Sequence, residues 1–71
     1  MNQKKAYKKF VKETKWLCNN LYREDISEYA NDTLNSLFTL FNYGCISANF
    51  YDMFVRRVAS AMHVTSIYDI P

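Results

Sequence analysis

The chain has 71 residues, a net charge of +2, two cysteines and one histidine. This length favours one small domain, residues 1–71. Two cysteines and one histidine are too few for a disulfide framework or a metal-ligand set, so we expect free, buried thiols, no metal and no cofactor. Charge is uneven, because residues 1–23 have a balance of +6 and residues 24–71 a balance of −4.

Scarce turn residues indicate a helical protein. One glycine and one proline are present, whereas turns normally consume both types. Five phenylalanines, six tyrosines and one tryptophan supply apolar surface that a small core needs. These features predict an all-α fold, a small three-helix bundle with a short C-terminal tail packed on it.

The first helix is predicted over residues 3–22. Its apolar side chains recur at the three- and four-residue spacing of a half-buried helix, with Thr14 filling a gap. The expected core positions are Tyr7, Phe10, Val11, Leu17, Cys18 and Leu21.

The second helix is predicted over residues 26–43, where Asp25 and Glu28 have capping-box spacing and Gly44 suits a left-handed end. The third is predicted over residues 48–63, after Ser47 as an N-cap. Their expected core positions are Ile26, Tyr29, Ala30, Leu34, Leu37, Phe38 and Phe41, then Tyr51, Phe54, Val55, Val58, Ala59 and Met62.

Lysines gather on the side of the first helix opposite its predicted apolar stripe, and Trp16 falls among them on a helical wheel. Lysines attract an acidic surface over a distance, and an exposed indole ring can anchor a partner. Two plainer interpretations stay open: a solvated lysine face, and coverage of Trp16 by the tail. The candidate partner-binding residues are Lys5, Lys8, Lys9, Lys12, Lys15 and Trp16.

Binding of nucleic-acid phosphates is the main alternative, because lysine–phosphate contacts need no sequence code. A helix-turn-helix around Gly44 is a weaker route, since Leu40 replaces the usual small residue and Asp52 would face phosphates. The nucleic-acid candidates are Lys4, Lys5, Lys8, Lys9, Lys12, Arg56 and Arg57.

Catalysis finds little support, because His63 is the single histidine and is expected at a helix end beside a short tail. Cys18 is expected on an apolar face, where a thiol is inert, and no glycine-rich phosphate loop occurs. We therefore expect a protein that is not an enzyme. The basic N-terminal segment is not followed by an apolar run, so we expect no signal peptide and no membrane partner. These expectations favour a location in the cytoplasm.

These features favour a non-enzymatic protein-binding module that occupies a surface of a larger protein with an acidic surface. In general character, though by no motif, the chain resembles small phage and mobile-element proteins that inhibit host proteins, such as CRISPR or replication components. The resemblance implies an inhibitor acting in the host cytoplasm. A homodimer formed through Trp16 and spare tyrosines is a third alternative.

Overall fold

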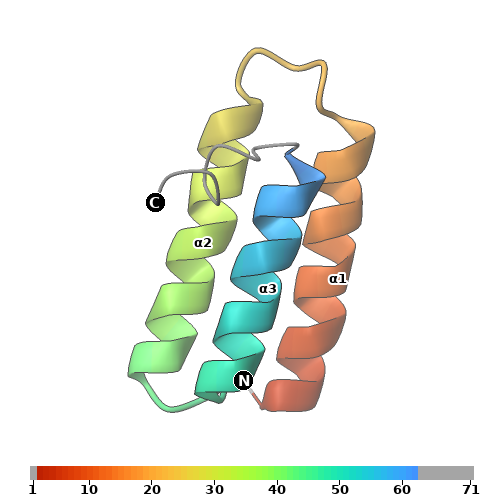
Figure 1. The fold of residues 1–71 in the computed structure, drawn as a ribbon. Helices are drawn as coiled ribbons and strands as arrows, with labels where there is room; N and C mark the ends of the chain where they lie inside the picture. The colour runs from red at the N-terminus through yellow and green to blue at the C-terminus, as the bar shows by residue number, and fades with distance from the viewer. Residues whose placement is uncertain (1, 63–71) are drawn as a thin grey trace.

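A computed structural model describes residues 2–62, which form three helices. They are α1 (Gln3–Asn19), α2 (Ile26–Asn42) and α3 (Ala48–Ala61), and no strand occurs in this range. The chain runs along α1, returns along α2 and runs back along α3, so that successive helices are antiparallel and α1 and α3 run in the same direction (Figure 1). The predicted all-α three-helix bundle is confirmed.

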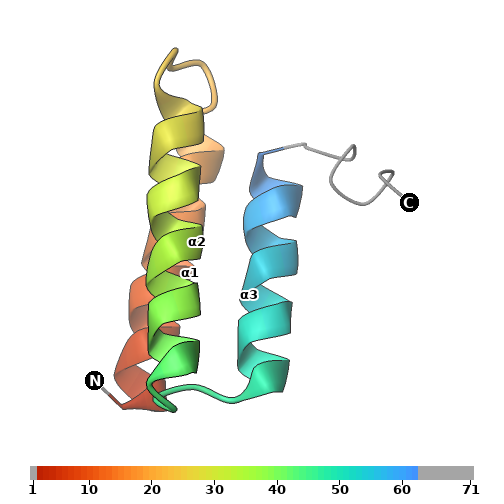
Figure 2. The same cartoon turned by 90° about the vertical axis from the view of Figure 1, so that its left-hand side faces the viewer.

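The helices form a triangular bundle. A view turned by 90° shows α3 to one side of α1 and α2 (Figure 2), and each helix contacts both of the others. Each pair of helices therefore meets along a flank of its own. The α1–α2, α2–α3 and α1–α3 flanks carry different side chains.

Aromatic rings from α1 and α3 occupy the centre of the core. Phe10 and Phe54 are fully buried, with ring centroids 5.8 Å apart. Phe50 packs on Phe54 at 4.9 Å and is 7% exposed, although its position lay outside the predicted stripe. Leu17, Leu37 and Val58 complete the set of fully buried large side chains.

The buried face of α1 is rotated from the predicted one. Ala6, Phe10, Thr14 and Leu17 are buried, whereas Tyr7 is 45% exposed and Cys18 is exposed. On a helical wheel this moves the face by roughly 45°. The prediction placed Tyr7 at the centre of the stripe because it counted size and overlooked Ala6.

Three aromatic residues that were predicted to lie in the α2 core are instead partly exposed. Ala30 and Leu37 are buried as predicted, and Thr33 joins them. Tyr29 is 40% exposed, Phe38 52% and Phe41 36%. A triangular bundle buries a narrow strip of each helix, so these three rings lie on its flanks.

α1 ends at Asn19, three residues before the predicted end at position 22. The Asn20 side-chain amide donates to the Trp16 carbonyl over 2.7 Å, and the Asn20 backbone N–H donates to the Leu17 carbonyl over 3.1 Å. These bonds satisfy carbonyl groups at the helix end and close the last turn. The predicted continuation through Leu21 is therefore wrong.

The start of α2 lacks the predicted capping box. Asp25 makes no side-chain cap hydrogen bond and instead accepts two bonds from Arg23, at 2.9 and 3.1 Å. The α2 end matches the prediction to one residue. Gly44 has a φ of 74°, and the Cys45 N–H donates to the Leu40 carbonyl in the pattern of a Schellman motif.

The start of α3 is confirmed, because the Ser47 hydroxyl accepts the Phe50 N–H over 3.1 Å. α3 ends at Ala61 and not at position 63. His63 and the predicted packed tail lie outside the described residues.

Candidate binding surface

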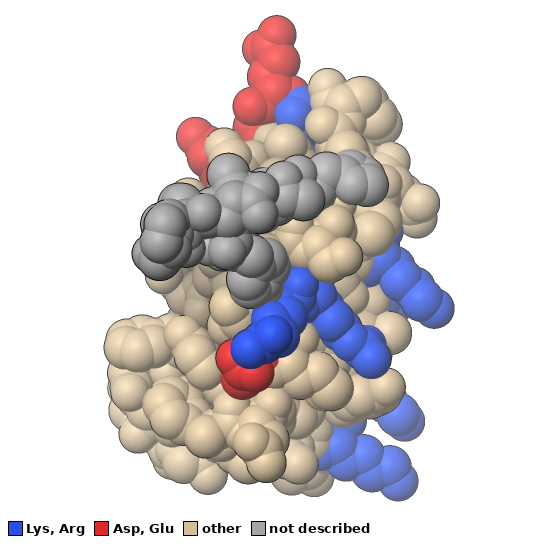
Figure 3. All heavy atoms as spheres, viewed as in Figure 1, with Lys and Arg blue, Asp and Glu red and all other residues tan. Residues whose placement is uncertain are grey.

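Five exposed lysines line the outer side of α1. We call this set the basic ridge, and it consists of Lys4, Lys5, Lys8, Lys12 and Lys15. The two ion pairs within residues 2–62 are Arg23–Asp25 and Arg56–Asp52, so neither neutralises the ridge. Figure 3 shows basic side chains projecting along the α1 edge of the molecule. Within residues 2–62 the ridge is thus a line of positive charge without ion-pair partners.

Lys9 differs from the ridge lysines in its surroundings. It is half-buried, and its ammonium nitrogen lies 5.3 Å from the centroid of the Phe10 ring. It lines a shallow depression with Asp32 and Asn35 of α2. Lys9 therefore belongs to the α1–α2 flank, although the sequence places it in both candidate sets.

Trp16 also leans toward α2. Its ring lies 4.8 Å from the Tyr29 ring, and the Arg23 guanidinium lies 5.6 Å from the Trp16 ring and 5.3 Å from the Tyr29 ring. The bidentate contact with Asp25 holds that guanidinium in place. The indole remains 38% exposed, but its described partners are Tyr29 and Arg23 and not lysines of the ridge.

Glu13 is the acid nearest to these groups on α1. Its Oε2 atom is buried without a hydrogen-bond partner among the described residues, in a depression shared with Trp16, Tyr29 and Asp32. Burial raises the pKa of Glu13, and the positive charge of Lys9 opposes this rise. Glu13 makes no ion pair with a ridge lysine among the described residues.

The two α3 arginines proposed for nucleic-acid binding point in different directions. Arg56 pairs with Asp52 over 3.0 Å, whereas Arg57 lies over the rings of Phe54 and Tyr7, at 5.1 and 6.0 Å. Arg57 therefore adjoins α1. The structure therefore brings together one part of the predicted nucleic-acid set and leaves Lys9 and Arg56 apart from it. The residues brought together are Lys4, Lys5, Lys8, Lys12 and Arg57.

A groove between α1 and α3 adjoins the ridge. Its volume is about 700 Å³, and the apolar side chains of Tyr7, Phe50 and Met53 line it beside Lys4 and Lys8. The Tyr7 ring packs edge-on against Phe54 at 5.6 Å and leaves one side open. The groove is not predicted by sequence periodicity, which places Tyr7 in the core.

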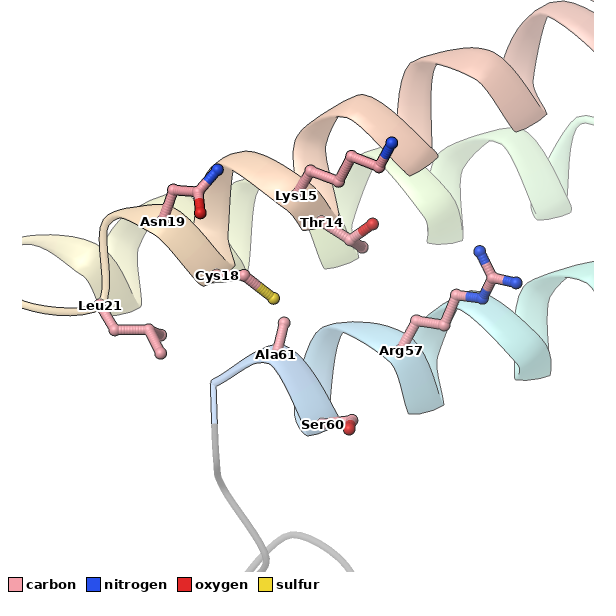
Figure 4. A pocket seen from close by; sticks show the side chains of 8 residues that line it. All are labelled: Thr14, Lys15, Cys18, Asn19, Leu21, Arg57, Ser60 and Ala61. Atoms are coloured by element: carbon pink, nitrogen blue, oxygen red, sulfur yellow. The ribbon is translucent and has the colours of Figure 1, made fainter.

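A second depression, of about 370 Å³, lies farther along the α1–α3 flank, and Cys18 is one of the residues that line it. Figure 4 shows the Cys18 thiol pointing from α1 toward Ala61 of α3, with Lys15 and Arg57 nearby. The prediction of buried thiols is wrong, because Cys18 is exposed and Cys45 is half-buried, though both are free.

The arrangement of α2 and α3 does not match a helix-turn-helix. Such motifs cross two helices steeply and place the second in the major groove. Here α2 and α3 lie side by side, antiparallel, along most of their length (Figures 1 and 2). Asp52 also lies on the outer surface of α3, paired with Arg56. Charge on α1 is the remaining feature that favours nucleic acid.

Searches for other kinds of site give negative results for the described chain. Residues 2–62 contain no group of three or more histidine, cysteine, aspartate or glutamate side chains placed to hold a metal ion. None of their helices combines the length and the apolar character that crossing a bilayer requires. Comparison of the chain with protein-family models, curated proteins and solved structures gives no match.

Proposed function

We propose that this chain is a non-enzymatic protein-binding module that takes an acidic surface of a larger protein along the basic ridge. The observation that carries the proposal is the juxtaposition of uncompensated lysines with the open ring of Tyr7. Lysines accelerate encounter and select acidic partners, and an apolar groove supplies the desolvated contact that holds a complex.

The groove defines the kind of contact that we expect. A partner segment with an apolar side chain fits against Tyr7 and Met53, while acidic groups beside it meet Lys4 and Lys8. Trp16 lies on the neighbouring α1–α2 flank and adds a contact at the edge. In this proposal the chain acts by occupancy, as an inhibitor of the kind that phages and mobile elements direct at host CRISPR or replication proteins.

Capture from a bacterial lysate, with and without nuclease, tests the class of partner. We expect one acidic protein to remain bound after nuclease treatment. Its affinity should fall at least tenfold for Lys8→Glu with Lys12→Glu, and for Tyr7→Ser. Tyr22→Ser is the matched control, because Tyr22 is 82% exposed and lies beyond the end of α1. Equal binding by all these proteins would refute the proposal.

Nucleic-acid binding is the second candidate, and the ridge alone favours it. Five lysines contacting duplex phosphates predict a slope of log K against log salt of about −4 to −5. A protein complex anchored by the groove should depend less on salt and should weaken on Tyr7→Ser. Loss of all captured material with nuclease, together with that steep slope and no effect of Tyr7→Ser, would establish this candidate instead.

A further inference from the structure

α1 carries a second row of apolar side chains beside the one that faces the core. Tyr7, Val11 and Cys18 fall within about 40° of one another on a helical wheel. Tyr7 is 45% exposed, Val11 is half-buried and Cys18 is exposed. The core takes Phe10 and Leu17 from α1 and leaves this second row on the α1–α3 flank, with the spacing that helices use to pack on a neighbour.

α3 lines the other side of the flank at a matching spacing. Phe50, Arg57 and Ala61 are separated by seven and four residues and therefore share one face of the helix. The groove at Tyr7 lies between the starts of α1 and α3, and the depression at Cys18 lies between their ends. Because α1 and α3 run in the same direction, the two hollows follow one another over about 16 Å, the rise of eleven helical residues (Figure 1).

Both hollows are lined by positive charge. Lys4 and Lys8 line the first, and Lys15 and Arg57 line the second. The Arg57 guanidinium also lies 6.0 Å from the centroid of the Tyr7 ring, so it stands between the two hollows. No acidic residue of the described chain lines either hollow, and Figure 4 shows Lys15 and Arg57 reaching the second from opposite helices. An acidic occupant finds complementary charge along the whole flank, which a neutral or basic one does not.

We propose that the α1–α3 flank seats an acidic, amphipathic α-helix of the partner, which packs as a fourth helix on the bundle. The inference rests on the proposed function and specifies the partner element. The backbone groups of α1 and α3 bond within their own helices, so an extended segment buried here would leave its polar backbone groups without partners. A helix satisfies its own backbone and presents its apolar side chains along one face.

The two hollows define the pattern expected in the occupant. Apolar side chains eleven residues apart on one helix face reach the groove at Tyr7 and the depression at Cys18. Acidic side chains beside them meet Lys8 and Lys15, and one near the middle meets Arg57. The bound helix therefore covers the Cys18 thiol, a contact that binding at the Tyr7 groove alone does not require.

A synthetic peptide tests the inference directly. The probe has about 15 residues, with leucines at positions 2, 6, 9 and 13 and glutamates beside them, and a second peptide has the same composition in an order without helical periodicity. Fluorescence anisotropy measures binding of each labelled peptide to the full chain. At low salt we expect a Kd below about 100 μM for the first peptide and at least tenfold weaker binding of the second. Equal affinities, or no binding of the first peptide at about 500 μM chain, overturn the inference.

Arg57 and Arg56 provide a matched pair of variants. Both side chains are exposed, so neither substitution removes core packing, but Arg56 pairs with Asp52 and lines neither hollow. We expect Arg57→Gln to weaken binding of the first peptide at least fivefold and Arg56→Gln to leave it unchanged. Circular dichroism checks that both variants keep their helix. Equal effects of the two substitutions overturn the inference.

Alkylation of Cys18 by iodoacetamide shows whether the occupant reaches the second hollow. Peptide mapping by mass spectrometry separates Cys18 from Cys45, which lines neither hollow and serves as the internal control. We expect the first peptide to slow modification of Cys18 at least fivefold without slowing that of Cys45. A Cys18 that is already unreactive in the free chain overturns the inference, because the chain itself then covers the flank.

Capture from the lysate distinguishes failure of this inference from failure of the proposed function. A captured protein that slows modification of Cys18 and depends on Arg57 supports both. A captured protein that depends on Tyr7 but leaves Cys18 as reactive as in the free chain overturns the fourth helix and retains the proposed function. Capture of nucleic acid alone overturns both.

Discussion

Trp16 illustrates how one side chain acquires surroundings that its sequence position does not reveal. A helical wheel places it among lysines, but the indole side chain reaches across the flank to Tyr29 of α2. Arg23, in the connection after α1, then covers both rings. The pattern of one helix could not predict this contact, because Tyr29 and Arg23 come from other segments.

The fluorescence of Trp16 reports on this packing directly, since it is the one tryptophan in the chain. We expect Tyr29→Ala to move its emission to longer wavelength, because removing the ring at 4.8 Å admits water to the indole. Tyr22→Ala provides the control, at an exposed tyrosine. An unchanged spectrum for Tyr29→Ala would show that Tyr29 does not shield Trp16.

Glu13 links burial to the dependence of stability on pH. Its folded-state pKa is raised above the ordinary value of 4.5, mainly by burial. The protonated form therefore favours the folded chain, and this contribution is complete below the unfolded pKa and is lost as pH rises through the folded pKa. The Oε2 atom of Glu13 has no hydrogen-bond partner among residues 2–62.

We accordingly expect Glu13→Gln to raise the free energy of unfolding at pH 7, by no more than about 1 kcal/mol because the group is partly solvated. Below pH 4 the advantage of the variant should vanish. Urea denaturation at both pH values measures this difference. A variant less stable than the natural chain at pH 7 would show that Glu13 is favourably paired when ionised.

At the scale of helices, the sequence predicted two capping signals, at Ser47 and Gly44, but neither the start of α2 at Asp25 nor the packing direction of α1. Ser47 and Gly44 were identified correctly because capping depends on a few adjacent backbone groups. The rotation of α1 was missed because it depends on which positions approach the other helices, and Ala6 reveals little by size. The groove at Tyr7 was not predicted for the same reason, since a residue assigned to the core is not proposed as part of a surface.

Gly44 offers a test of the α2 end. Its φ of 74° is unfavourable for residues with a Cβ atom, whereas no atom within 4 Å would clash with one. We expect Gly44→Ala to cost about 1 kcal/mol of unfolding free energy through backbone strain alone. Gly44→Asn should cost less, because asparagine tolerates this conformation. Equal stability of all three chains in urea would contradict a left-handed residue here.

For the whole molecule, each of the three flanks between helices has a different surface feature. The α1–α2 flank packs the half-exposed Trp16 ring against Tyr29, and the α2–α3 flank presents the stacked rings of Phe41 and Tyr51. The α1–α3 flank has the groove beside the basic ridge. The sequence predicted the bundle and the lysine face, because both follow from periodicity. It could not assign aromatic residues to flanks, since that requires knowing how three helices meet.

The basic ridge should cost stability, because it places like charges close together on one helix. Lys8 has three lysines spaced three or four residues from it, Lys4, Lys5 and Lys12, and like charges at such spacing each destabilise a helix by about 0.2–0.5 kcal/mol. Lys8→Glu turns these repulsions into attractions. We expect it to raise the free energy of unfolding by about 1 kcal/mol at low salt, and by less at 1 M salt, where charges are screened.

Lys15→Glu is the matched control, because Lys12 is the one lysine within a turn of Lys15 and the gain should be correspondingly smaller. Thermal unfolding at two salt concentrations measures both effects. A lysine face that is merely solvated predicts the same gain in stability with no loss elsewhere. A binding ridge predicts that the more stable Lys8→Glu chain captures less of its partner, and this opposition of stability and binding distinguishes the two interpretations.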